Sequence, residues 1–170
     1  SGHNPNDYVV ERLECYSHDD KLIPITVTRH KNTKIDGTAN LLLYGYGSYG
    51  SSMWPGFSST RFSLIDRDII WVTAHIRGGM EKGMKWWKEG KLLYKKNTFE
   101  DYISVAKFLI NEKYTSEGKI IGMGGSAGGL LMGAVVNQEP NLFLGMIMAV
   151  PFVDSLTTNL DHSLPLTVGE

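Results

Sequence analysis

The segment Gly124-Gly125-Ser126-Ala127-Gly128 limits the possible folds of this chain more than any other, because it places a serine among small residues at an expected change of secondary structure. The apolar residues 120–123 before it predict a short buried strand, and the apolar residues 130–136 after it predict a buried helix. A G-x-S-x-G segment between a strand and a helix is typical of a nucleophile elbow, where a tight turn holds the serine hydroxyl away from the sheet. We therefore interpret Ser126 as the candidate nucleophile. The alternative is a glycine-rich turn with an incidental serine.

The composition is that of an ordinary globular domain. The 170 residues are 42% hydrophobic and 21% charged, which is enough to bury one substantial core. The formal net charge of −1 provides no attraction to nucleic acid or to an anionic membrane, so we expect neither as a partner. The longest apolar stretch, residues 142–153, is too short to span a bilayer and is interrupted by Gly145 and Pro151. We expect it to form a core strand.

The only cysteine, Cys15, excludes an internal disulfide framework. The sequence does not start with a basic segment followed by an apolar one, as a signal peptide would. These two features predict a reducing, cytoplasmic setting. We expect neither a cofactor nor a metal ion.

Strands and helices alternate along the chain. Residues 8–16 and 22–29 are two β-rich runs joined by a short polar segment, which predicts a leading hairpin. The expected elements that follow are strand 41–44, weak helix 57–66, strand 69–76, a helix ending near residue 114, strand 119–123, helix 130–136 and strand 144–150. This order, with apolar strands and a nucleophile elbow, predicts a doubly wound, mostly parallel α/β sheet of the α/β-hydrolase kind.

A capping box is predicted at the start of the long helix that ends near residue 114. Asn97 or Thr98 would cap the first turn, and Glu100 or Asp101 would reach back to it from three residues further on. The apolar residues that follow recur at helical spacing. One face of this helix should therefore pack against the sheet.

Two features near the ends of the expected strands suggest site positions. Residues 45–56 form a long loop rich in glycine and aromatic residues, and α/β sheets bind ligands beyond the carboxyl ends of their strands. We interpret this segment as a candidate site loop, the alternative being a packing loop. His75 lies in an apolar strand region and invites the role of catalytic base. We interpret it instead as a core or site-wall residue, because the base of an α/β-hydrolase follows the nucleophile along the chain.

Several ordered motifs carry a more specific indication. They lie at residues 44–50, 77–79, 96–102, 124–129, 137–138 and 150–154. Together they resemble the prolyl oligopeptidase family, most closely its oligopeptidase B branch, over residues 8–170. The resemblance implies the catalytic α/β-hydrolase domain of a serine peptidase that cleaves short peptides after lysine or arginine. It also implies a β-propeller cap, which these residues do not encode.

The resemblance assigns roles to four residues. Ser126 matches the nucleophile of the family. Tyr46 matches the tyrosine whose hydroxyl forms the oxyanion hole together with the backbone N–H after the nucleophile, here that of Ala127. Glu170 matches an acidic residue that pairs with the basic side chain on the acyl side of the cleaved bond. Donors fixed where negative charge develops are what acyl transfer requires.

The chain departs from the family pattern at three positions. Trp54 and Gly56 stand where this branch commonly carries acidic residues of a second basic subsite. A preference for paired basic residues is therefore not expected. Met80 stands where a further glycine is usual, a change that the sequence does not explain.

The catalytic set is incomplete in this sequence. The acid and the base of an α/β-hydrolase should follow the nucleophile on later strands. Asp154, Asp161 and His162 come before those strands, and we interpret them as structural or site-wall residues. We therefore expect a leading β-hairpin in residues 1–36 and the first part of the hydrolase core in residues 37–170, truncated after the strand that follows the nucleophile helix.

Such a chain should be almost inactive alone, and its open sheet edge should favour self-association. Two other functions remain open from the residues. One is an esterase or acylaminoacyl hydrolase, since the same elbow serves these reactions. The other is a non-catalytic scaffold on the same fold.

Overall fold

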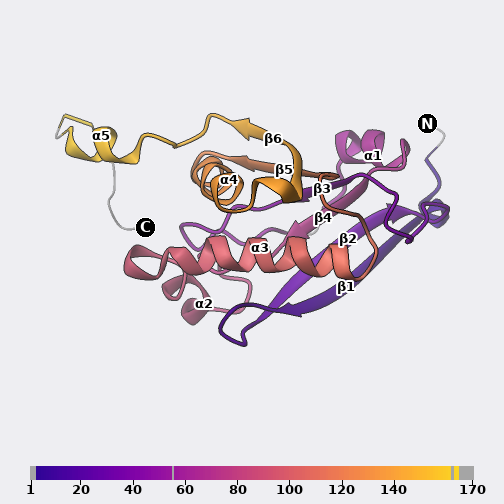
Figure 1. The fold of residues 1–170 in the computed structure, drawn as a ribbon, viewed down its shortest axis with the longest axis horizontal. Coiled ribbons are helices and arrows are strands. Elements are labelled where there is room, and N and C mark those ends of the chain that lie inside the picture. The colour runs from indigo at the N-terminus through magenta and orange to yellow at the C-terminus, as the bar shows by residue number, and fades with distance from the viewer. Residues whose placement is uncertain (1–2, 55, 162, 165–170) are drawn as a thin grey trace.

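The computed structural model describes residues 3–54, 56–161 and 163–164. Within these residues, a six-stranded sheet runs in the order β1-β2-β4-β3-β5-β6 (Figure 1). The strands are β1 (Tyr8–Tyr16), β2 (Leu22–His30), β3 (Leu41–Tyr44), β4 (Ile70–Ala74), β5 (Ile120–Gly125) and β6 (Phe143–Ala149). β1 and β2 pair as an antiparallel hairpin, and β2 pairs antiparallel with β4. The four strands from β4 to β6 are parallel.

Helices cover both faces of this sheet. They are α1 (Ser59–Ile65), α2 (Met84–Lys88), α3 (Lys96–Asn111), α4 (Ala127–Gln138) and α5 (Ser155–Leu160), with short 3₁₀ turns at Pro5–Asp7, Leu92–Tyr94 and Pro140–Leu142. The α1 side chain of Arg61 stacks over Trp71 of β4, whereas the adjacent Val72 is fully buried in the main core. Because neighbouring strand residues point to opposite faces, α1 lies on one face and the core helices lie on the other. The expected doubly wound arrangement is confirmed.

The main core lies between the sheet and helices α3 and α4. Tyr102 of α3 is fully buried, and its hydroxyl donates a hydrogen bond of 2.6 Å to the carbonyl oxygen of Leu43 in β3. Its ring also stacks on Phe143, at a centroid distance of 6.4 Å. α3 therefore fixes the central strand that leads into the loop containing Tyr46.

The capping box predicted at Asn97 or Thr98 is wrong. α3 begins at Lys96, and its N-cap residue Lys95 makes no side-chain capping bond. The Thr98 hydroxyl instead donates to the carbonyl oxygen of Arg77 at 2.8 Å, and the Asp101 carboxylate accepts bonds from Arg77. The side chains that would form a local cap therefore make hydrogen bonds to a distant segment of the chain instead.

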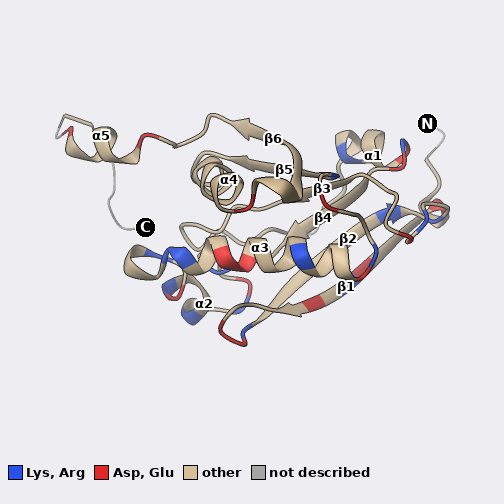
Figure 2. Ribbon diagram, in the orientation of Figure 1, with Lys and Arg blue, Asp and Glu red and all other residues tan. Residues whose placement is uncertain are grey.

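The strand expected in residues 142–153 is present as β6, but the prediction that it lies in the core is wrong. β6 is paired with β5 on one side and forms the last strand of the described sheet. Leu144 is 61% exposed and Val150 is 84% exposed. The elements β5, α4 and β6 contain no charged residue, as their uniform tan colour in Figure 2 shows. An apolar sheet edge is thus open to solvent.

We expect the 170-residue chain to self-associate through this edge. An unpaired strand edge offers free backbone N–H and C=O groups, and an uncharged apolar patch adds to the attraction. Sedimentation velocity should show the average mass rising with protein concentration. A charge introduced by Leu144→Lys should reduce this association.

A matched control lies outside the sheet. Leu93 in the 3₁₀ turn Leu92–Tyr94 is 96% exposed, so Leu93→Lys changes net charge equally without touching β6. Its association should equal that of the unmodified chain. A monomer that persists at millimolar concentration would contradict the expectation.

None of the helices in the described residues is long and apolar enough to cross a membrane.

Candidate active site

Ser126 lies in a strained turn between β5 and α4. Its backbone has φ 55° and ψ −117°, a conformation that costs a residue with a side chain about 1–3 kcal/mol. Its backbone N–H donates to the carbonyl oxygen of Ala149 at 2.9 Å, and its own carbonyl oxygen accepts from the Phe152 N–H at 3.0 Å. The side chain is exposed. The chain after β6 thus holds this serine in a turn that presents its hydroxyl to solvent.

Two glycines permit this turn because backbone groups approach them too closely for a side chain. A Cβ atom on Gly124 would lie 2.3 Å from the carbonyl oxygen of Gly128. A Cβ atom on Gly128 would lie 2.9 Å from the carbonyl oxygen of Gly45, in the loop after β3. The flanking glycines of the motif therefore allow β5, α4 and this loop to meet at the serine.

The same close approach brings Tyr46 beside the turn. A Cβ atom on Gly128 would lie 3.3 Å from Cδ2 of the Tyr46 ring, so the ring packs against the first turn of α4. Tyr46 is half-buried and lies two residues after the end of β3. The tyrosine and the serine thus come from neighbouring parallel strands and meet at their carboxyl ends.

Ala127 is the first residue of α4 and is buried. The first N–H groups of a helix have no acceptor within the helix, and the N-terminus carries a partial positive charge. A negatively charged oxygen near Ser126 would therefore be stabilised by this end of α4.

The acidic residues after β6 serve local turns. Asp154 Oδ1 caps α5 by accepting the Thr157 N–H at 3.1 Å. Asp161 Oδ1 accepts the Ser163 hydroxyl at 2.6 Å and the Ser163 N–H at 2.9 Å, and these bonds hold the pKa of Asp161 below its usual value. His162 and Glu170 lie outside the described residues. Within the described residues, no hydrogen bond joins the Ser126 side chain to a histidine or a carboxylate.

His75 follows β4 and lies against β2. It is 6% exposed, and its Nε2 lies 2.8 Å from Oγ1 of Thr26. Its Nδ1 lies 3.5 Å from Oε1 of Glu81. The histidine thus packs among side chains of β2 and of the loop after β4, as a site-wall residue would.

A buried ion-pair network braces the loop after β4, and the sequence did not reveal it. Arg77 and Asp101 are 1% and 0% exposed. Arg77 Nε donates to Asp101 Oδ2 at 2.8 Å, and Arg77 Nη2 donates to Asp101 Oδ1 at 2.6 Å. The other side of the guanidinium donates to both oxygens of Asp19 at 2.6 and 2.9 Å. The hairpin turn, the loop after β4 and α3 are thereby joined at one cation.

The network shifts the pKa values of two members. Burial alone would lower the pKa of Arg77, but the hydrogen bonds and negative charges of Asp101 and Asp19 outweigh it and raise that pKa. Burial would raise the pKa of Asp19, but the bond to Arg77 lowers it below its usual value. Arg77 is therefore a permanent cation at the centre of the network.

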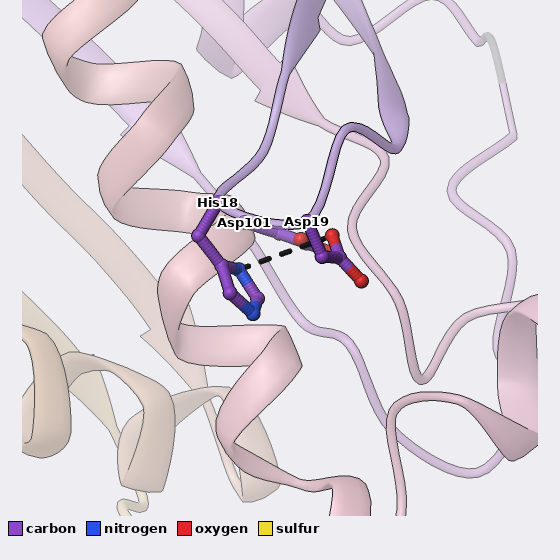
Figure 3. A group of neighbouring side chains, drawn as sticks. All are labelled: His18, Asp19 and Asp101. Carbon is purple, nitrogen blue, oxygen red and sulfur yellow. Dashed lines mark ion pairs between the residues drawn. The ribbon is translucent and has the colours of Figure 1, made fainter.

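His18, Asp19 and Asp101 lie close enough together to suggest a cation site, as Figure 3 shows. His18 Nδ1 is 3.9 Å from Asp19 Oδ1, the contact drawn as a dashed line. Both oxygens of each aspartate already accept hydrogen bonds from Arg77. A metal ion here would have to displace a buried guanidinium, so the group is an ion-pair network.

Comparison with known proteins shows that the chain is similar to members of one protein family. The family profile described as "Prolyl oligopeptidase family" matches residues 55–170. Dipeptidyl aminopeptidase BI of Pseudoxanthomonas mexicana is 48% identical over 170 residues, which are 99% of this chain and 24% of that protein. Protease 2 of Moraxella lacunata is 49% identical over 160 residues, 94% of this chain and 23% of that protein. The chain thus spans about a quarter of these curated relatives.

Solved structures give the same result. Oligopeptidase B from Leishmania major is 46% identical with a TM-score of 0.94, over 98% of this chain and 23% of that one. Oligopeptidase B from Trypanosoma brucei, with covalently bound antipain, is 41% identical with a TM-score of 0.95, over 99% and 24% of the two chains. The α/β-hydrolase fold expected from the sequence is confirmed.

Proposed function

Because this chain belongs to the prolyl oligopeptidase family, we propose that it is the nucleophile-bearing part of a serine peptidase. The peptidase would cleave short peptides after lysine or arginine through an acyl-enzyme on Ser126. The resemblance to proteins called protease 2 and oligopeptidase B supports the peptidase class and the branch. The Trypanosoma brucei structure contains covalently bound antipain, which supports a covalent step in the proposed reaction.

The observation that carries the proposal is the backbone of Ser126. A non-glycine residue at φ 55° costs free energy, and such strain persists where the surroundings fix it, often at a functional residue. Here the strain leaves an exposed hydroxyl at the N-terminus of a twelve-residue helix. A nucleophile in this position attacks a carbonyl carbon while the helix end stabilises the oxygen that becomes negative.

In the proposed mechanism, the Tyr46 hydroxyl and the Ala127 N–H hold that oxygen. The packing of the Tyr46 ring on Gly128 supports this pairing, since it brings the side chain beside the first turn of α4. The base and the acid that complete a triad would be supplied by residues beyond this chain, as the family order requires. Without them, the isolated chain should hydrolyse peptides at a rate close to background.

We expect Tyr46→Phe in the full-length protein to lower kcat by about 10²–10³-fold, as loss of one oxyanion donor does. KM should change little, because the hydrogen bond forms mainly in the transition state. Steady-state kinetics on an arginyl amide measures both constants.

Tyr16→Phe is a suitable control, because Tyr16 of β1 is 67% exposed. It removes the same hydroxyl and should leave kcat unchanged. An unchanged kcat in Tyr46→Phe would remove this tyrosine from the mechanism.

Glu170 is proposed to pair with the basic side chain on the acyl side of the cleaved bond; it lies outside the described residues. A guanidinium can donate two parallel hydrogen bonds to a carboxylate. We therefore expect Glu170→Gln to lower kcat/KM for arginyl substrates by at least about 10-fold, since breaking a buried charge pair costs about 2–5 kcal/mol. Substrates with a neutral residue at that position should lose much less.

The exposed Glu117 provides the control, since Glu117→Gln makes the same change of charge away from the site. Equal losses on arginyl and neutral substrates in Glu170→Gln would place Glu170 on the solvated surface.

A substrate panel tests the reaction class. The full-length protein should hydrolyse arginyl amides faster than prolyl amides and simple esters. Preference for esters would favour the esterase alternative, and no turnover of any of them would favour a scaffold. The cytoplasmic setting stays a prediction.

A further inference from the structure

A pocket of about 490 Å³ lies on the face of the sheet that carries α1. Its floor is a row of directly paired strand residues: Arg12 pairs with Thr26, Thr26 with Thr73, and Thr73 with Tyr44. Directly paired residues point to the same face of a sheet, so this row forms one continuous surface. The volume is in the range of small-molecule sites.

Three buried polar atoms around this pocket have no hydrogen-bond partner among the described residues. They are Arg61 Nε, His75 Nδ1 and Glu81 Oε2, and all three side chains line the pocket. The side chains of His75 and Glu81 are 7% and 10% exposed. Buried polar atoms are paired in native proteins, because leaving one unpaired costs its full desolvation. All three belong to side chains of the pocket lining, so this lining carries a guanidinium, an imidazole and a carboxylate whose hydrogen-bonding capacity is not used up within the described residues.

The surroundings fix two of these atoms in place. Glu81 Oε1 accepts the Met53 N–H at 3.0 Å, which holds the carboxylate with its second oxygen unpaired. The Arg61 guanidinium stacks over the Trp71 ring at 4.9 Å. Burial lowers the pKa of Arg61, and no acidic side chain among the described residues offsets that effect. The cation is thus partly desolvated and has no counter-charge in this part of the chain.

The charged side chains of the lining determine which class of ligand this pocket can bind. Arg61 offers an N–H donor to an anionic group, and Arg12 adds a second guanidinium to the lining. Glu81 offers an acceptor to a cationic or N–H group. A phosphate dianion would face the Glu81 carboxylate, whereas a group with separate positive and negative ends matches both walls. Met53 and Met80 provide an apolar part of the lining.

We propose that this pocket binds a small zwitterion of amino-acid or dipeptide size. Its carboxylate would accept from Arg61, its ammonium group would donate to Glu81, and its side chain would lie against Met53 and Met80. A single water molecule can hydrogen-bond to any one of these polar atoms, but the volume of the pocket is that of many water molecules. The site does not use Ser126, so it stands whether or not the proposed peptidase activity does.

Binding of the dipeptide Gly-Leu tests the proposal. Isothermal titration calorimetry on the 170-residue chain and on the full-length protein should detect Gly-Leu. Gly-Leu amide and N-acetyl-Gly-Leu each lack one charge and should bind at least 10-fold more weakly. These comparisons need no variant, so they remain decisive even if a substitution unfolds the protein.

Methionine methyl NMR locates the site. Gly-Leu should shift the methyl signals of Met53 and Met80, which line the pocket, and leave that of Met132, which is fully buried in the core, unchanged. Unshifted Met53 and Met80 signals at a Gly-Leu concentration that saturates the calorimetric binding would overturn the assignment.

Two variants test the contacts. Arg61→Gln and Glu81→Gln should each weaken Gly-Leu binding at least 10-fold, while Arg67→Gln, which changes an arginine just beyond α1, should not. Loss of binding in Arg67→Gln, equal binding of the three dipeptide forms, or no heat at 20 mM Gly-Leu with folded protein would each overturn the proposal. Binding by the short chain but not by the full-length protein would also overturn it, because another segment would then fill the pocket.

Discussion

Replacing Ser126 by alanine in the full-length protein is expected to lower kcat for an arginyl amide by about 10⁶-fold, which is the size of effect seen when a catalytic serine is removed. The acyl-enzyme cannot form without the hydroxyl, and only binding and the oxyanion donors remain. The exposed position of this side chain means that its removal leaves no cavity. Steady-state kinetics should therefore show lost turnover in a protein with unchanged circular dichroism.

A second substitution separates catalysis from strain. Ser126→Gly removes the same hydroxyl and also relieves the cost of φ 55°, since glycine populates positive φ freely. It should be as inactive as Ser126→Ala but more stable by about 1–2 kcal/mol. Equal stability of the two variants would show that the turn is not strained, and retained activity in either would exclude Ser126 as the nucleophile.

Removing Asp101 is expected to destabilise the fold by about 3–5 kcal/mol, because it leaves the buried Arg77 guanidinium without its main partner. Arg77 Nε and Nη2 and the Arg77 backbone N–H all donate to this carboxylate. Urea denaturation of Asp101→Ala measures the loss directly.

Asp19→Ala provides the comparison within the same network. Asp19 bonds the other side of the guanidinium, but its side chain is 34% exposed, so water can replace it. Its loss should cost much less than that of Asp101. Equal losses would mean that burial does not decide the strength of these ion pairs.

The elbow and the sheet could be predicted because their signals are local. Glycines around Ser126, an apolar run before it and an apolar helix after it specify the turn without reference to distant residues. The leading hairpin is equally visible, since β1 and β2 are two β-rich runs with a short polar turn between them.

The features that the sequence predicted wrongly, or did not predict, depend on contacts between distant parts of the chain. Thr98 looked like a helix cap, but it bonds the Arg77 carbonyl oxygen instead. Arg77 and Asp101 are 24 residues apart, and no spacing rule connects them. Apolar composition suggested a core strand at β6, but burial depends on what lies beyond the edge.

Some features of the candidate site could also be predicted from the local sequence, and others could not. The strained turn at Ser126 follows from the motif, whereas the roles of Tyr46 and Glu170 rest on family resemblance. The presence of Arg61 and Glu81 in the lining of one pocket depends on the sheet register and on α1. Only the folded chain brings them together.

The most direct test of the central claim is labelling of the full-length protein with a fluorophosphonate, followed by peptide mass spectrometry. This electrophile reacts with an activated serine and not with ordinary surface hydroxyls, because a serine hydroxyl is a weak nucleophile without an adjacent base. One phosphonyl group per chain on Ser126, appearing in step with loss of arginyl amidase activity, is the predicted result. Complete loss of activity with Ser126 unlabelled, or a label on another serine, would contradict the account.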